Sequence, residues 1–250
     1  PVWKPFFFAG DFDGRRLTPR CEGLVDYGGN LYAPQVFIDE RGRVILWGWI
    51  WEARPNDEIL SAGWAGVMSL PRLLSLNADG SLASHPAPEV ESLRRQRSDL
   101  PAQTLAVGDL PIPGLRGAVC EILARFTPGS AQCFGLRVLC APDGSQHTTI
   151  GYDCVQRQVF IDRSQAGLQP KMAFDWPNPT YHSAPLDLAE GEPLELRVFL
   201  DQSVIEVFTN RGLVLSSRVY PAHPEQSTAI LFSTGGQERL LGLYAWQLSL

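Results

Sequence analysis

The sequence contains no run of lysine or arginine, and lysine itself occurs only at Lys4 and Lys171. The formal net charge is −6 at pH 7 and the pI is about 5.2. Because nucleic acids bind clustered basic surfaces, we expect no nucleic-acid partner. No apolar run approaches the roughly 20 residues that cross a bilayer, so we expect no membrane partner either. The first residues do not resemble a signal peptide, but a chain that began downstream of one would show none, so the localisation (cytoplasmic or secreted) stays open.

Cysteine and histidine are sparse and lack the spacing of a metal site. The five cysteines are an odd number without a Cys-x-x-Cys pair, and the four histidines stand singly. These patterns argue against a disulfide framework and against a zinc site. We expect the cysteines to be small buried side chains and the histidines to lie at the surface or in turns.

Sustained helical periodicity is also absent, and residues 90–98 are the only short helical candidate. Apolar runs at residues 35–39 and 44–51 flank a turn that contains Gly42, which predicts a hairpin. A second hairpin is predicted at residues 73–84, which enclose an Asn-Ala-Asp-Gly turn. The sequence therefore predicts an all-β fold.

A polar, proline-bearing stretch between residues 86 and 113 divides the chain, and we place the domain junction there. Downstream of it, short strand-like runs recur between turn signals, and apolar and polar residues alternate along residues 194–200. Such a pattern is typical of a β-sandwich. We therefore predict one domain at residues 1–95 and a sandwich with its own core at residues 105–250.

Four blocks of sequence carry a family resemblance. They are Asp-Tyr-Gly-Gly-Asn-Leu-Tyr-Ala-Pro-Gln at 26–35, Ile-Leu-Trp-Gly-Trp at 45–49, Gly-Trp-Ala-Gly-Val-Met-Ser-Leu-Pro-Arg at 63–72, and Leu-Arg-Val-Phe-Leu-Asp-Gln-Ser-Val-Ile-Glu-Val-Phe-Thr-Asn at 196–210. In this order and at this spacing the blocks resemble glycoside hydrolase family 32, the invertases, levanases and inulinases that cut β-fructofuranosidic bonds. The resemblance extends from about residue 7 to residue 250.

The resemblance implies the C-terminal part of a five-bladed β-propeller at residues 1–95, followed by the β-sandwich. The first region has room for about two four-stranded blades, which alone would leave apolar faces and strand edges uncovered. The parent protein would be a retaining β-fructofuranosidase that acts on sucrose or a fructan oligosaccharide, with no cofactor and no metal. The alternatives are a fructosyltransferase, a non-catalytic carbohydrate-binding protein, or a sandwich that only stabilises the protein or forms a homodimer.

The carboxyl groups that such a reaction needs are missing from this sequence. A retaining glycosidase uses two carboxyl groups, one as nucleophile and one as acid/base. In the family these belong to Trp-x-Asn-Asp-Pro-Asn-Gly and Glu-Cys-Pro blocks, with a further Asp in Arg-Asp-Pro, and none of the three blocks occurs here. Cys21-Glu22 has the reversed order and no proline after it. A Gly-Asp-Phe-Asp-Gly stretch at residues 10–14 matches the sequence that follows Glu-Cys-Pro, so we expect the catalytic residues to lie upstream and the chain to be inactive.

By the same resemblance, three residues of this chain belong to the substrate-binding site: Asp26, Tyr32 and Trp49. Trp49 would pack against the sugar, and Tyr32 would contribute to the pocket wall. Asp26 would bind hydroxyls of the sugar beyond the scissile bond, held at the pocket rim by a glycine-rich turn. The alternatives are an Asx turn over Gly28 for Asp26 and a simply packed tyrosine for Tyr32.

Neighbouring aromatic residues are open to two interpretations. On a strand Trp47, Trp49 and Trp51 share one face, where they could form a platform for a sugar ring or part of the core. We expect Trp47 and Trp51 to be packing residues. The family commonly has Asp where this chain has Asn30, which puts the polar contacts of the pocket at that position in doubt.

The downstream block contains two acids that do not look catalytic. Asp201 and Glu206 are five residues apart, so on one strand they would point to opposite faces. We expect Asp201 and Ser203 to shape a hairpin turn and Glu206 to be a surface residue of the sandwich.

Overall fold

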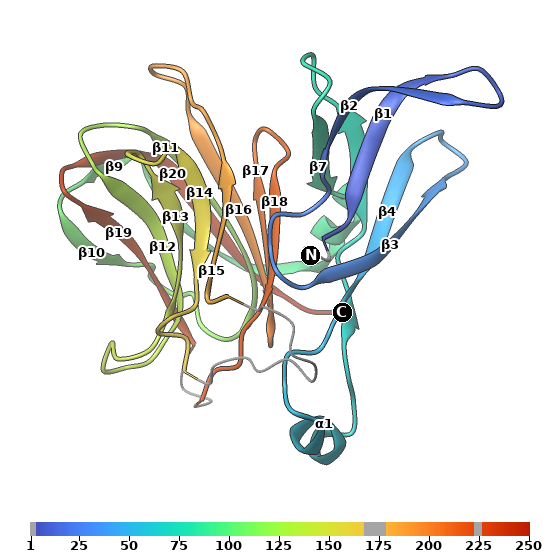
Figure 1. Cartoon of the computed structure of the whole chain (residues 1–250). Coiled ribbons are helices and arrows are strands. Elements are labelled where there is room, and N and C mark those ends of the chain that lie inside the picture. Colours follow the sequence, from blue (N-terminus) through green and yellow to red (C-terminus); the bar gives the residue numbers. More distant parts are fainter. Residues whose placement is uncertain (1–3, 168–178, 223–226) are drawn as a thin grey trace.

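The computed structural model describes residues 4–167, 179–222 and 227–250, and nearly all of its regular structure is β-strand. The all-β prediction is thus confirmed. The helical elements in the described ranges are α1 (Asn56–Ala62) and a 3-10 helix, η1 (Pro88–Leu93). Figure 1 shows two parts side by side, with the earlier strands on the right, the later strands on the left, and α1 extending below the first part.

The first part consists of two antiparallel sheets, which we call the N-terminal sheets. Their strands are β1 (Phe6–Phe12), β2 (Leu17–Leu24), β3 (Leu31–Ile38), β4 (Val44–Ile50), β5 (Val67–Met68), β6 (Arg72–Leu76) and β7 (Leu82–Pro86). β1 pairs with β2, and the other sheet has the order β3-β4-β6-β7 with β5 beside β4. The hairpins β3–β4 and β6–β7 are the two that the turn residues predicted.

The second part consists of two larger sheets and is called the two-sheet unit. Its strands are β8 (Arg94–Leu100), β9 (Gln103–Leu105), β10 (Gly108–Pro111), β11 (Val119–Thr127), β12 (Cys133–Cys140), β13 (Thr148–Asp153), β14 (Gln158–Asp162), β15 (Tyr181–Pro185), β16 (Leu194–Asp201), β17 (Val204–Thr209), β18 (Val214–Arg218), β19 (Thr228–Thr234) and β20 (Glu238–Leu248). A six-stranded sheet has the order β10-β19-β12-β13-β14-β15, and a seven-stranded sheet has the order β18-β17-β16-β11-β20-β8 with β9 beside β20. Buried apolar residues from both sheets form one core.

The segment expected to join the two parts is itself folded into the sheets. The helical candidate at residues 90–98 is wrong beyond Leu93, because β8 begins at Arg94 and pairs with β20. β8 forms because it covers the edge of β20 and because Arg94 supplies two hydrogen bonds, of 2.8 and 2.7 Å, to the fully buried carboxylate of Glu121. Pairing within the two-sheet unit therefore begins well before residue 105.

Strand β17 is buried on both faces, and this fixes how the two parts meet. Ile205 and Val207 point into the core of the two-sheet unit. Val204 packs instead with apolar residues of the N-terminal sheets, while Phe208 joins a small cluster that includes Val90 of η1. With side chains alternating along a strand, residues 204, 206 and 208 all face outward. The N-terminal part therefore covers the outer face of the seven-stranded sheet.

Deleting β8 tests its contribution to the two-sheet unit. We expect the segments 89–250 and 105–250 both to give β-type circular dichroism and cooperative unfolding, with the shorter one less stable. The loss of Arg94 alone leaves Glu121 short of a charged partner, which costs about 1.5–3 kcal/mol and lowers the urea midpoint by about 1 M. Equal midpoints would show that β8 adds nothing to the unit, and a disordered 89–250 segment would show that the unit cannot fold by itself.

Candidate functional site

Three aromatic side chains meet at the open end of the β3–β4 hairpin, away from its turn. The rings of Tyr32 and Trp51 are stacked, with centroids 5.0 Å apart and planes 9° from parallel. Trp49 meets both rings edge to face, at 6.4 Å from Tyr32 and 6.2 Å from Trp51. Trp49 stays 41% exposed, so the cluster presents an open aromatic surface. Large, rigid rings of this kind suit the apolar C–H faces of a sugar.

A β-bulge places Tyr32 in this cluster. Tyr32 lies opposite Trp49, and Gln35 lies opposite Trp47, so β3 has one more residue than β4 between these pairs. The extra residue is accommodated at Ala33, which adopts a left-handed conformation with φ 45°. Directly opposite side chains in an antiparallel pair lie on the same face, so the Tyr-Ala sequence brings Tyr32 beside Trp49.

The other two tryptophans differ in their surroundings. Trp51 follows β4 and is packed on Tyr32, and its indole Nε1 donates to the carbonyl of Gly29 at 3.4 Å. Trp47 is 39% exposed on the same face as Trp49, so the expectation that it is a packing residue is wrong. The reason is that β4 turns its other face, with Leu46, Gly48 and Ile50, towards the buried side.

Glu52 and Arg54, which follow the cluster along the chain, form an ion pair that no sequence motif predicts. The Arg54 Nε and Nη2 atoms donate to the two oxygens of Glu52 at 3.0 and 2.7 Å. The Arg54 guanidinium also lies 4.2 Å from the centroid of the Trp64 ring. The only signal in the sequence is the position of Glu52 directly after Trp51.

Glu52 is further held by the two-sheet unit. The Tyr220 hydroxyl donates to the Glu52 carboxylate, and the Arg218 Nη2 donates to it at 3.1 Å. Burial would raise the pKa of Glu52, but the hydrogen bonds from Arg54 and Tyr220 and the charge of Arg218 outweigh it and lower the pKa to about 2. Burial also raises the pKa of Tyr220 to about 12, so its hydroxyl stays protonated and can donate.

Asp26 lies on a loop as expected, but it is buried, with 1% of its surface exposed. Its Oδ1 accepts the N–H of Gly28 at 2.8 Å, which confirms the Asx turn that was the alternative interpretation. The same atom accepts the N–H of Ser216 at 2.9 Å, and Oδ2 accepts the Ser216 hydroxyl at 2.6 Å. These contacts support a structural role, and sugar binding by Asp26 stays a prediction.

Arg72 joins Asp26 to Glu206 across the boundary between the two parts. The Arg72 Nη1 is 2.8 Å from Asp26 Oδ2, and its Nε and Nη2 are 3.1 and 2.6 Å from Glu206 Oε2. Arg72 is 0% exposed and Glu206 only 3%, so the expectation that Glu206 lies at the surface is wrong. Burial would lower the pKa of Arg72, but the two carboxylates raise it above its ordinary value. At Glu206 the outward face of β17 is covered by Arg72 and the residues just before β6, which the alternation along β17 alone cannot reveal.

The turn after Asp26 is pressed against β18. The N–H groups of Tyr27 and Gly29 donate to the carbonyls of Val214 and Ser216 at 2.8 and 3.1 Å. A Cβ atom on Gly28 would lie 1.9 Å from the carbonyl oxygen of Ser216, so only glycine allows this approach. Asn30, also fully buried, accepts the N–H of Arg218 at 3.0 Å through its side-chain oxygen. This oxygen thus faces the two-sheet unit.

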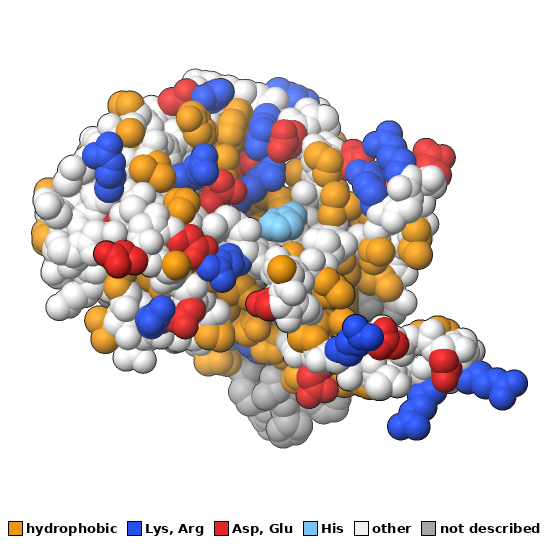
Figure 2. Space-filling model, turned by 90° about the horizontal axis from the view of Figure 1, so that it is seen from above, with side chains coloured by type: hydrophobic (Ala, Val, Ile, Leu, Met, Phe, Trp, Pro, Cys, Tyr) orange, Lys and Arg blue, Asp and Glu red, His pale blue; other side chains and the backbone are white. Residues whose placement is uncertain are grey.

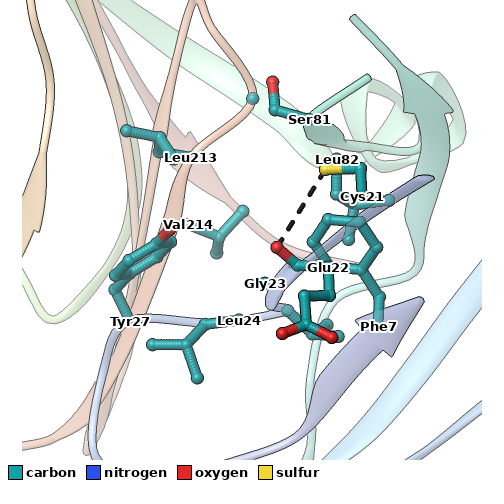
Figure 3. A pocket seen from close by; sticks show the side chains of 12 residues that line it. Phe7, Cys21, Glu22, Gly23, Leu24, Tyr27, Ser81, Leu82, Leu213 and Val214 are labelled. Atoms are coloured by element: carbon teal, nitrogen blue, oxygen red, sulfur yellow. Dashed lines mark hydrogen bonds between the residues drawn. The ribbon is translucent and has the colours of Figure 1, made fainter. Parts of the chain in front are cut away.

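A separate small pocket lies between β1–β2 and the turns β6–β7 and β17–β18, and Figure 3 shows its lining. Glu22 contributes to it beside Phe7, and the Cys21 thiol points to the Glu22 carbonyl (Figure 3). None of the clustered aromatic rings lines this pocket. Glu22 therefore lies apart from the aromatic surface, as expected for a residue that only resembles the acid/base block.

Other classes of site find no support in the described part of the chain. Within it, no group of three or more metal-ligand side chains lies together. None of its helices is long and apolar enough to cross a membrane. On the face that Figure 2 shows, basic side chains lie beside acidic ones, so this face carries no continuous basic patch. The hairpin prediction at Asp201 and Ser203 is confirmed, since β16 and β17 join there through a tight turn.

The Arg72 network makes a testable contribution to stability. Replacing Arg72 by Met leaves two buried carboxylates without their cation, and we expect a loss of about 3–5 kcal/mol in unfolding free energy. Adding Glu206→Gln should recover part of this loss because it removes one uncompensated charge. The control is Arg43→Met, whose ion pairs with Asp39 and Glu89 are exposed to solvent, so its loss should change the urea midpoint much less than the loss of Arg72. Similar urea midpoints for the Arg72 and Arg43 variants would contradict the network's importance.

The low pKa of Glu52 predicts a pH dependence. A carboxyl group whose pKa is lowered by folding stabilises the protein above its unfolded pKa, and that contribution is lost as pH falls through the folded value. The difference in unfolding free energy between the chain and its Glu52→Gln variant should therefore be largest above about pH 4.5 and shrink towards pH 2. Denaturant titrations at several pH values measure this difference, and one that grows on acidification would refute the ionised, hydrogen-bonded Glu52.

Comparisons with known proteins agree with these features. The family model described as "Glycosyl hydrolases family 32 N-terminal domain" matches residues 4–86, and "Glycosyl hydrolases family 32 C terminal" matches residues 89–247. A levanase of Bacillus sp. (strain L7) is 31% identical over 95% of this chain, which is 26% of that protein. A sucrose-6-phosphate hydrolase of Escherichia coli is 31% identical over 90% of this chain and 43% of that protein.

Solved structures show the same fold. Fructan 1-exohydrolase IIa from Cichorium intybus superposes with a TM-score of 0.83 at 22% identity, over 97% of this chain and 54% of that chain. An exo-inulinase from Aspergillus awamori also gives a TM-score of 0.83 at 22% identity, over 97% of this chain and 49% of that one. The chain thus spans about a quarter to a half of the length of these relatives. Because the two family models together match nearly all of its residues, the chain belongs to glycosyl hydrolase family 32.

Proposed function

We propose that this chain is part of a retaining glycosidase that cleaves β-fructofuranosidic bonds in sucrose or fructans. The single observation that carries the proposal is the open aromatic surface of Tyr32, Trp49 and Trp51, in which Tyr32 and Trp49 belong to the family's sequence blocks. The family's relatives include proteins named levanase and sucrose-6-phosphate hydrolase. In this proposal Trp49 packs on the sugar, Tyr32 supports it from the side, and Asp26 acts mainly as a structural residue.

The same proposal states which parts of the parent protein carry the catalytic residues and which this chain supplies. The nucleophile and the acid/base would lie outside these 250 residues, since none of the family's carboxylate blocks occurs in the sequence. The N-terminal sheets would be blades of a five-bladed propeller, and the two-sheet unit would be the C-terminal sandwich. Support comes from the exposed apolar residues Phe8, Phe37 and Ile38 on β1 and β3, which a neighbouring blade would cover.

The requirements of a retaining mechanism explain why we expect the chain alone not to hydrolyse its substrate. The mechanism needs a carboxylate that attacks the anomeric carbon and a second carboxyl that protonates the leaving oxygen. Without a nucleophile no glycosyl-enzyme forms, and without an acid/base group a further factor of about 10²–10⁴ is lost. Glu22 is exposed and lines a pocket that the rings of the aromatic surface do not line, which supports the proposal that it replaces neither group.

Two measurements on the purified chain test the proposal. We expect no release of fructose from sucrose or levan, in the chain and in its Glu22→Gln variant alike. We expect binding of sucrose or 1-kestose, measured by tryptophan fluorescence, and Trp49→Ala should raise the Kd about five- to tenfold, because it removes the ring that packs on the sugar. Trp246→Ala, on β20 outside the cluster, should leave the Kd unchanged and serves as control.

Any of three results would contradict this account. Fructose release that Glu22→Gln abolishes would make Glu22 the catalytic acid. An unchanged Kd in Trp49→Ala would remove the aromatic surface from the sugar site. Binding with no hydrolysis even after the family's preceding sequence is supplied would favour the non-catalytic carbohydrate-binding alternative.

A further inference from the structure

Hydrogen bonds connect residues of the two-sheet unit to the residues that follow Trp51 in the aromatic surface. Tyr220 follows β18 and is only 8% exposed. Besides donating to Glu52, its hydroxyl accepts the N–H of Ala53 at 3.1 Å and the Nε–H of Arg218 at 3.1 Å. A single buried hydroxyl thus orders the backbone and the carboxylate that follow Trp51. Removing it would take an acceptor from the Arg218 Nε–H and a donor from Glu52, while the Ala53 N–H would keep only its second acceptor, Glu52 Oε1 at 3.0 Å.

Glu52 and Arg54, which Tyr220 and Arg218 hold in place, are hydrogen-bonded in turn to the segment that follows α1. Arg54 Nη2 donates to the carbonyl of Trp64 at 3.2 Å, and the N–H of Gly66 donates to Glu52 Oε2 at 3.4 Å. α1 itself buries no residue and cannot hold this segment in place. The segment at residues 64–66 is therefore held in place by the Glu52–Arg54 ion pair.

The same segment is in direct contact with Trp49. A Cβ atom on Gly66 would lie 2.0 Å from the indole Nε1 of Trp49, so the two are packed without any gap. Gly66 has φ 67°, a conformation that glycine adopts without strain. Directly after it, β5 pairs with β4, with Met68 opposite Trp49. The position of the Gly66 backbone consequently limits how the Trp49 ring can turn.

We propose that Tyr220 and Arg218 of the two-sheet unit are positioning residues for Trp49: through Glu52 they hold the 64–66 segment against the indole and fix the ring that faces the sugar. This inference rests on the proposed function, in which Trp49 contacts the sugar. It gives the two-sheet unit a part in substrate recognition although its residues need not touch the substrate. A binding surface is most effective when its rings are held in place before the ligand arrives.

The first test needs no ligand. In a ¹H–¹⁵N spectrum of the whole chain, the indole N–H resonance of Trp49 is assigned by its loss in Trp49→Phe. We expect Tyr220→Phe and Glu52→Gln both to shift or broaden this resonance, while Tyr244→Phe, a half-buried tyrosine on β20, leaves it in place. Two variants are used so that the test still stands if one of them does not fold. A Trp49 resonance that stays in place in both folded variants overturns the inference.

The second test is a double-mutant cycle on sugar binding. Tyr220→Phe should raise the Kd for sucrose or 1-kestose about fivefold in the wild-type background, the effect of one lost hydrogen bond to a charged group acting through Trp49. In a Trp49→Ala background the same change should alter the Kd less than twofold, because the residue it positions is gone. Equal effects in both backgrounds would show a general structural role and overturn the inference.

The two proposals fail in different ways. If Trp49→Ala weakens binding but Tyr220→Phe does not, the positioning inference is wrong and the sugar site stands. If Trp49→Ala leaves the Kd unchanged, the proposed sugar site is wrong and the inference falls with it, whatever the resonance of Trp49 does.

Discussion

The buried guanidinium of Arg72 is the interaction on which the arrangement of the two parts depends. It lies at the boundary, fully out of solvent, between Asp26 of the N-terminal part and Glu206 of the two-sheet unit. Charges at such depth are tolerated only when they are paired and hydrogen-bonded. The hydrogen bonds from Arg72 to Asp26 and Glu206 require a particular relative position of the three side chains. The ion pairs therefore specify one position of the N-terminal sheets on β17 and β18.

This position decides where the candidate sugar surface lies. The turn after Asp26 is fixed on β18, and it leads directly into β3, whose bulge at Ala33 brings Tyr32 beside Trp49. A second connection runs from Tyr220 through Glu52 to the segment that packs on the Trp49 indole. The aromatic surface is thus supported at both ends by the two-sheet unit. Under the proposed function, the two-sheet unit would support the recognition surface as well as form its own core.

The sequence predicts the local features and misses the long-range ones. Both hairpins, the Asx turn at Asp26 and the turn near Ser203 follow from turn residues close in sequence. The burial of Asp26 depends on Arg72, 46 positions away, and on Ser216, 190 positions away, which no local pattern reports. Alternation predicts which face of β17 carries Glu206 but not what covers that face, so the sequence does not reveal that Glu206 is buried.

Long-range contacts also decide the structure of the expected linker and of the residues behind the candidate site. A polar, proline-bearing stretch resembles a connection between domains, yet β8 within it completes a sheet because β20 offers an open edge. Glu52 and Tyr220 have no motif of their own, since their contact joins positions 168 residues apart. Tertiary packing, rather than local propensity, creates this part of the candidate site.

Amide hydrogen exchange on the chain and on Arg72→Met is the most direct test of the claim that the arrangement of the two parts depends on Arg72. In the wild-type chain, amides of β4 and β6 should exchange only through the same opening as amides of β17 and β18. In Arg72→Met, β4 and β6 should lose protection first, while β11 and β16 in the core of the two-sheet unit stay protected. Equal loss of protection in all these strands, or none, would contradict the account.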